Sequence, residues 1–126
     1  MTENEISTEI VDVAFKIHTE LGPGLFESVY EAVMAEWLSR RGLKAVRQQA
    51  IPVTCENVHL EQGFRADLIV EDRVIVEIKS VEAIAPVHIK QVLTYLRLAG
   101  KKLGLLINFD TALVKDGIRR VVNGSL

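Results

Sequence analysis

The chain has little cysteine, no long apolar run and no recognisable export signal. Cys55 is the only cysteine, so it has no partner in the chain for a disulfide or a cysteine-based zinc site. No apolar run approaches the roughly 20 residues that a helix needs to cross a bilayer. The amino terminus, MTENEISTEI, is acidic and lacks a basic-then-apolar pattern. We therefore expect a reducing, cytoplasmic setting and no membrane partner.

The chain also lacks an excess of positive charge. Its formal net charge is -2, which excludes a broadly basic nucleic-acid coat. Any contact with nucleic acid must use a local basic cluster or a bound cation. Hydrophobic residues make up 48% and charged residues 25% of the 126 residues, as in globular proteins. With no repeat, linker or low-complexity tract, this length predicts a single domain over residues 1–126.

Apolar spacing and helix breakers predict two helices at the start of the chain. Residues 6–21 carry apolar side chains at helical intervals, and the Gly-Pro-Gly at 22–24 ends this pattern. A second helix is expected over residues 26–41, before Gly42. Its predicted apolar stripe consists of Phe26, Val29, Tyr30, Val33, Met34, Trp37 and Leu38.

The rest of the chain is predicted to form strands and one more helix. Residues 44–53, 63–70 and 74–80 have strand character, and the short polar connection at 71–73 predicts a hairpin between the last two. A helix is expected from Pro86 to Gly100. Residues 103–109 predict a buried strand, and residues 117–123 an edge strand. A strand–helix–strand crossover near the end indicates an α/β fold with a mixed sheet flanked by helices.

Three charged residues interrupt these apolar strands. Glu77 and Lys79 project from one face of their strand, and Asp67 falls nearly opposite Glu77 across the hairpin. Two carboxylates this close raise each other's pKa unless a cation lies between them. Oxygen ligands of this kind suit Mg²⁺ or Mn²⁺, and a neighbouring ammonium can act on a water or stabilise a charged phosphate. The alternative is an exposed Glu77–Lys79 ion pair, worth about 0–1 kcal/mol.

Two helical segments supply further candidates. Gly24, Glu27 and Tyr30 follow at three-residue intervals, so Glu27 and Tyr30 share a helix face. Alternatively, Glu27 is an exposed first-turn residue that favours the helix dipole. Gln91 and Tyr95 are four residues apart on one face of the later helix, either facing a site or forming a solvated flank.

The segment LGPGLFESVYE resembles the signature of the GxxExxY protein family. The resemblance continues through FRADLIVEDRVIVEIKSVE, KQVLTYLRL and KKLGLLINF, and it covers about residues 6–122. This family is placed in the PD-(D/E)XK nuclease superfamily. The resemblance therefore implies a restriction-endonuclease-like core, a mixed sheet flanked by helices.

The resemblance also implies roles for individual residues. Asp67 and Glu77 would be metal ligands, together with the backbone carbonyl of Ile78, and Lys79 would be the catalytic lysine. Glu27 resembles the acidic residue of the first core helix, which supports a metal or its water. Gln91 and Tyr95 resemble a Q-x-x-x-Y pair beside the active site. One departure is Ala66, which stands where the superfamily name has proline.

Together these features predict a Mg²⁺- or Mn²⁺-dependent nuclease that acts on DNA rather than RNA. The alternative is a non-catalytic nucleic-acid-binding or regulatory module that keeps the fold. Its candidate phosphate contacts are Arg40, Arg41, Lys44 and Arg47, or Lys90, Arg97, Lys101 and Lys102. A chain of this size has little surface for a long substrate, so we also expect a homodimer formed through residues 103–109 or the last strand.

Overall fold

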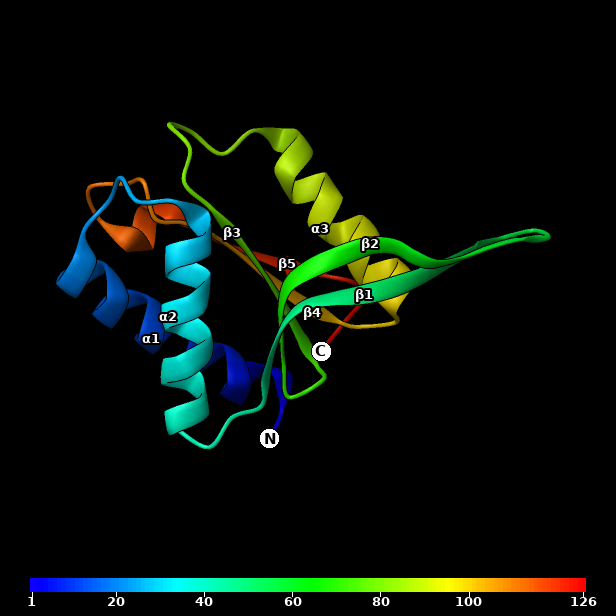
Figure 1. The fold of residues 1–126 in the computed structure, drawn as a ribbon, viewed down its shortest axis with the longest axis horizontal. Helices are drawn as coiled ribbons and strands as arrows, with labels where there is room; N and C mark the ends of the chain where they lie inside the picture. Colours follow the sequence, from blue (N-terminus) through cyan, green and yellow to red (C-terminus); the bar gives the residue numbers. More distant parts are fainter.

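A computed structural model describes all residues from 1 to 126, and its elements follow the predicted order (Figure 1). The helices are α1 (Glu3–Leu21), α2 (Glu27–Arg40) and α3 (Pro86–Ala99), with a short 3₁₀ turn, η1 (Val114–Gly117). The strands are β1 (Ala45–Cys55), β2 (Val58–Val70), β3 (Val74–Lys79), β4 (Leu103–Asn108) and β5 (Ile118–Val122).

The strands form one mixed sheet in the order β1-β2-β3-β4-β5. β2 and β3 pair antiparallel across residues 71–73, which confirms the predicted hairpin. β3 and β4 are parallel, because α3 carries the chain over the sheet between them. β5 pairs antiparallel with β4 and closes that side of the sheet as an edge strand, as predicted. The α/β fold class is therefore confirmed.

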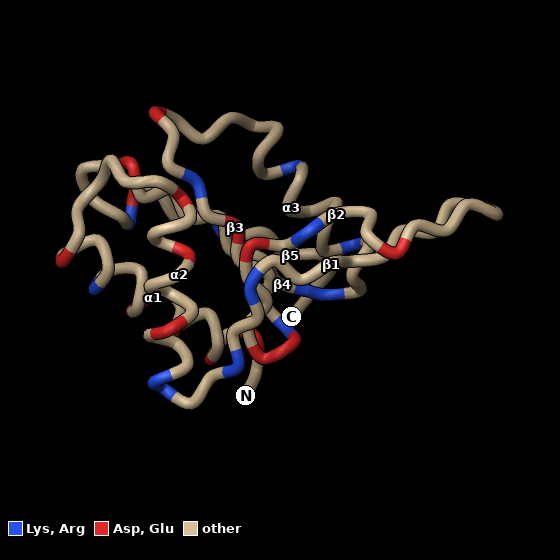
Figure 2. The backbone as a smooth tube through the Cα atoms, viewed as in Figure 1, with Lys and Arg blue, Asp and Glu red and all other residues tan.

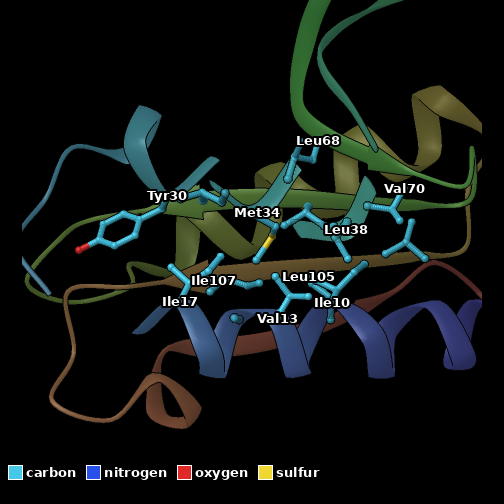
Figure 3. Close-up of a cluster of buried hydrophobic side chains, with 14 of the residues drawn as sticks. Ile10, Val13, Ile17, Tyr30, Met34, Leu38, Leu68, Val70, Leu105 and Ile107 are labelled. Atoms are coloured by element: carbon cyan, nitrogen blue, oxygen red, sulfur yellow. The ribbon is translucent and has the colours of Figure 1, made fainter. Parts of the chain in front are cut away.

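The helices cover the sheet on both faces. α1 and α2 pack on one face, where Ile10, Val13 and Ile17 of α1 meet Met34 and Leu38 of α2 above β3 and β4 (Figure 3). α3 packs on the other face through Val92 and Leu96. Along β3 the side chains alternate between these two cores. Val74, Val76 and Ile78 face α1 and α2, whereas Ile75 faces α3. Glu77 and Lys79 share the parity of Ile75, so they lie on the α3 side of the sheet.

One glycine sets how closely α3 approaches the sheet. A Cβ atom at Gly104 of β4 would lie 2.6 Å from Cγ1 of Val92, closer than such atoms approach in proteins. The absence of a side chain at this position lets α3 lie directly on β4. This close packing fixes the height of α3 above β3.

The predicted stripe of α2 was wrong at its first two positions. Phe26 is 83% exposed and Val29 is also exposed, whereas Tyr30, Met34 and Leu38 are buried. Phe26 has extended backbone angles and precedes the helix, so it does not share the helical face. The buried face then repeats every four residues from Tyr30.

Tyr30 holds the loop between α1 and α2 in place. Its hydroxyl donates to the carbonyl of Gly22 at 2.7 Å and accepts from the backbone N–H of Leu25 at 3.1 Å. Its ring stacks on Phe109, at the end of β4, with centroids 4.3 Å apart. The Gly-Pro-Gly loop is thereby tied to the end of the central sheet.

The first two strands are longer than predicted. β1 runs to Cys55 and β2 begins at Val58, so only Glu56 and Asn57 separate them. The outer part of this hairpin extends away from the rest of the molecule (Figure 1). All residues from 54 to 63, which we call the arm, are exposed.

Candidate active site

The two predicted carboxylates meet where β2 separates from β3. Backbone pairing between these strands ends at Leu68 and Val76, so Asp67 and Glu77 would form the next pair. Instead, the backbone N–H of Asp67 donates to Oε2 of Glu77 at 2.9 Å. The N–H of Ile78 donates to Oδ2 of Asp67 at 2.8 Å. Side chains thus replace backbone carbonyls at this fork, and they bring the two carboxyl groups together.

Burial and repulsion act together on Glu77. Its side chain is only 5% exposed, and burial raises its pKa to about 8, with the charge of Asp67 as the next cause. Asp67 is half-buried beside it. A buried pair of carboxyl groups needs either a shared proton or a cation before both can be stable. The fork is therefore a place where a cation would be favoured.

Lys79 lies near this pair without being neutralised by it. It is half-buried, and no carboxylate lies within 4.0 Å of its ammonium group. Its positive charge has a smaller effect that lowers the pKa of Glu77. The alternative of an exposed Glu77–Lys79 ion pair is therefore wrong, because Glu77 is buried and Lys79 makes no such contact.

α3 brings one of its two predicted residues to the carboxylates. Tyr95 is half-buried and stacks on Phe64 of β2, with ring centroids 4.0 Å apart. Burial raises the pKa of Tyr95, and the charges of Glu77 and Asp67 raise it further. Gln91, one turn earlier on α3, is exposed.

Glu27 lies in a different place. It is exposed and lines a surface pocket together with Gly24, Ser80 and Asp110, beyond the end of β3. It makes no hydrogen bond or ion pair to Asp67 or Glu77. The hydroxyl of Ser80 donates to the carbonyl of Leu25 at 2.8 Å and joins this loop to β3. The structure therefore places Glu27 beside the end of the strand that carries Lys79, with no direct bond to the carboxylate pair.

The buried carboxylate of α2 is Glu31, which the sequence reasoning missed. It accepts from Nε of Arg47 at 2.9 Å and from Nε2 of Gln48 at 2.7 Å. The same nitrogen of Gln48 lies 3.3 Å from Oδ1 of Asp67. Two signals were present in the sequence: an acid directly after Tyr30, and the polar run Arg47-Gln48-Gln49 within a predicted strand.

The donors at the fork fit a hard divalent cation. Nowhere in the chain do three or more His, Cys, Asp or Glu side chains gather as a metal cluster. An ion would therefore be held by Asp67, Glu77, water and the carbonyl of Ile78. The N–H of Ile78 points toward Asp67, and the carbonyl of the same residue lies on the same edge of the strand. Such an oxygen-only set, completed by water, suits Mg²⁺ or Mn²⁺.

The mixed sheet and its flanking helices form a nuclease-type fold. A family model described as the PD-(D/E)XK nuclease superfamily matches residues 4–121, and the chain belongs to that superfamily. No curated protein and no solved structure shows significant similarity to the chain. The narrower assignment to the GxxExxY family stays a prediction. None of the helices has the length and apolar character required to span a membrane.

Proposed function

We propose that this protein is a divalent-metal-dependent nuclease that hydrolyses phosphodiester bonds, with DNA as its substrate. The observation that carries the proposal is the pairing of buried Glu77 with half-buried Asp67, with an unpaired lysine beside them. Two structural alternatives fit less well. A purely structural ion pair would neutralise the lysine, and an ordinary apolar core would not contain a second carboxylate. Membership of a nuclease superfamily supports the same conclusion.

Asp67 and Glu77, with the Ile78 carbonyl, would hold Mg²⁺ or Mn²⁺. When bound, the ion would polarise a phosphate oxygen and make a water more acidic. Lys79 would orient this water and offset negative charge on the phosphate as the water oxygen bonds to phosphorus. The attacking water gives up a proton to solvent, the phosphorus bond to the leaving sugar oxygen breaks in the same displacement, and this oxygen takes up a proton from solvent. Tyr95 would contact the phosphate or Lys79, and Gln91 would contact the substrate from the exposed side of α3.

Cleavage assays on purified protein test this proposal. Wild type should cleave at least one of single-stranded DNA, duplex DNA, branched DNA and RNA in the presence of Mn²⁺ or Mg²⁺, and chelation should abolish the activity. Lys79→Ala should lower the rate about 10²–10³-fold, because it removes a group that orients the attacking water and offsets negative charge on the phosphate. Glu77→Ala should lower it at least as much, because it removes a metal ligand.

Lys115→Ala provides a matched control, since Lys115 is exposed on η1, away from the fork. Its cleavage rate should equal that of wild type. The proposal is wrong if wild type cleaves none of the four substrates with either ion, or if Glu77→Ala cleaves as fast as wild type.

The basic residues of the chain give less support to a non-catalytic nucleic-acid-binding module. Along the backbone, Lys and Arg are interspersed with Asp and Glu (Figure 2). Of the candidate phosphate contacts, four are already engaged with carboxylates: Arg40, Arg41, Arg47 and Lys101. Metal-independent binding by this negatively charged chain would need a stronger patch. Calorimetry with DNA and no divalent ion tests this alternative directly.

We also propose that the protein is cytoplasmic and forms a homodimer. Residues 103–109 are all buried, so the predicted dimer contact through this segment was wrong. The proposed dimer contact is therefore the last strand, β5, because it pairs only with β4 and its outer edge is open. A second copy pairing along β5 would double the surface for a long substrate. Light scattering at several protein concentrations would measure the oligomeric state.

A further inference from the structure

Gln48 has an unusual backbone for a residue inside a strand. Its φ angle is 51°, in the left-handed region that residues other than glycine adopt at an energetic cost. β1 and β2 are paired on both sides of it, through Arg47 with Leu68 and Gln49 with Ala66. In this register Gln48 lies opposite Asp67. The distortion is thus confined to the point that faces the candidate metal ligand.

The distorted residue uses its side-chain amide to join two carboxylates. Nε2 of Gln48 donates to Oε1 of Glu31 at 2.7 Å and to Oδ1 of Asp67 at 3.3 Å. A side-chain amide nitrogen carries two hydrogens, so both bonds can form at once. Glu31 is held in turn by Nε of Arg47 at 2.9 Å. The chain of contacts runs from α2 through β1 to Asp67 on β2.

Both oxygens of Asp67 are therefore oriented by the protein. Oδ2 accepts from the N–H of Ile78 at 2.8 Å, and Oδ1 accepts from Gln48 on the opposite side. Each carboxylate oxygen has two lone-pair sites, so one site on each remains for a cation. Without Gln48, Oδ1 would lose its side-chain partner, and the carboxylate could rotate about the remaining bond to Ile78.

We propose that Gln48 is a positioning residue that orients Asp67 for metal binding by linking it to buried Glu31. The inference rests on the proposed function, since it assumes that Asp67 binds the ion. It assigns no contact between Gln48 and substrate or metal. Outer groups that orient metal ligands typically contribute 10–100-fold to metal affinity.

Gln48→Gly tests the role of the side-chain amide separately from that of the left-handed backbone. Glycine adopts the left-handed conformation without cost, so the variant should unfold at the same temperature as wild type or higher when no metal is present. Its affinity for Mn²⁺, measured by calorimetry on the full chain, should fall about 10–100-fold. A purely structural role for Gln48 would instead lower the unfolding temperature and leave the affinity unchanged.

Glu56→Gly is the matched control. Glu56 has a φ angle of 52° at the tip of the β1–β2 hairpin, so it undergoes the same backbone relief far from the fork. Its Mn²⁺ affinity should equal that of wild type. Gln48→Asn is a second variant. Asparagine tolerates the left-handed conformation, but its side chain is one carbon shorter and should not reach both carboxylates. Its affinity should fall as in Gln48→Gly.

The outcomes distinguish the inference from the proposed function. Weaker Mn²⁺ binding in both Gln48 variants, with Glu56→Gly unchanged, supports the positioning role even if wild type cleaves no nucleic acid. Unchanged binding in both folded Gln48 variants overturns the positioning role and leaves the nuclease proposal intact if wild type cleaves. If wild type binds no Mn²⁺, the positioning role is overturned as well.

Discussion

The centre of the sheet and the arm belong to the same β-sheet but differ in almost every physical respect. β3 is buried from Val74 to Ile78, and every residue of β4 is buried between two layers of helices. Residues 54–63 form a two-stranded ribbon with no helix on either face, and all of them are exposed. β2 belongs to both regions, because its last three residues are buried in the centre and its first six lie in the arm.

The candidate site lies at the boundary between these two regions. Asp67 is on β2 just before its buried end, and Glu77 is on β3 inside the centre. Burial on the central side raises the pKa of Glu77, which makes a cation favourable. Separation of β2 from β3 on the arm side leaves Asp67 half-exposed and accessible to a ligand. The site thus combines a buried carboxylate on the central side with an accessible carboxylate on the arm side.

The largest expected effect comes from truncating a side chain in the centre. Ile75→Ala should lower the free energy of unfolding by roughly 4 kcal/mol, because Ile75 is fully buried and the neighbouring side chains cannot fill the space. Leu60→Ala, at an exposed position of the arm, should change it by less than about 0.5 kcal/mol. Urea unfolding curves measure both values. Equal losses in the two variants would show that the arm is packed against something.

A second effect concerns the pH dependence of stability without metal. The folded pKa of Glu77 is raised to about 8 from an ordinary value of 4.5. Between these values the folded protein keeps a proton that the unfolded chain has lost, so stability should fall as the pH rises. The expected loss from pH 5 to pH 8 is roughly 3 kcal/mol, because the slope reaches about 1.4 kcal/mol per pH unit midway and is smaller near each pKa value.

Glu77→Gln serves as the control for this pH effect, because its amide does not titrate. Its free energy of unfolding should vary less with pH, and it should exceed that of wild type at pH 8. Adding Mn²⁺ to wild type should restore stability at pH 8, because the ion favours the ionised pair. An identical pH dependence in wild type and Glu77→Gln would contradict the raised pKa.

The smallest expected effect comes from shortening the arm. Ile51 and Phe64 are paired across the hairpin, so residues 52–63 can be replaced by Asn-Gly, which favours a two-residue turn. The free energy of unfolding should change by less than about 1 kcal/mol, because an uncovered two-stranded ribbon contributes little stability. Mn²⁺ affinity should remain that of wild type, since the shortened chain keeps Gln48, Asp67 and Glu77. A large loss of affinity would show that the centre and the arm are coupled.

Most of the fold could be predicted because its signals are local. The Gly-Pro-Gly after residue 21 and the glycine at 100 end two helices, and the apolar run at 103–109 marks a buried strand. The outer arm was missed because residues 54–62 are mostly polar and lack a sustained alternation. Their strand conformation depends on pairing with each other, and this pairing cannot be recognised from either segment alone.

The site was predictable only where a short turn fixes the register. Because residues 71–73 connect β2 to β3, the sequence places Asp67 opposite Glu77, and the hydrogen bonds at the fork agree with this placement. The contact between Glu31 and Gln48 joins a helix to a strand, and its geometry depends on a left-handed residue. Glutamine gives no local signal for that conformation, unlike glycine or asparagine.

The hydrogen bonds of Tyr30 bear on what its spacing from Gly24 signifies. Tyr30 fastens a loop to the end of the sheet through Gly22, Leu25 and Phe109, and it contacts neither Asp67 nor Glu77. These contacts do not involve the fork, so they would persist in a chain that had lost its acidic residues there. A genome search with the Gly-x-x-Glu-x-x-Tyr pattern would therefore select chains that share this loop. Under the proposed function, the residues corresponding to Asp67, Glu77 and Lys79 would distinguish active nucleases from inactive relatives.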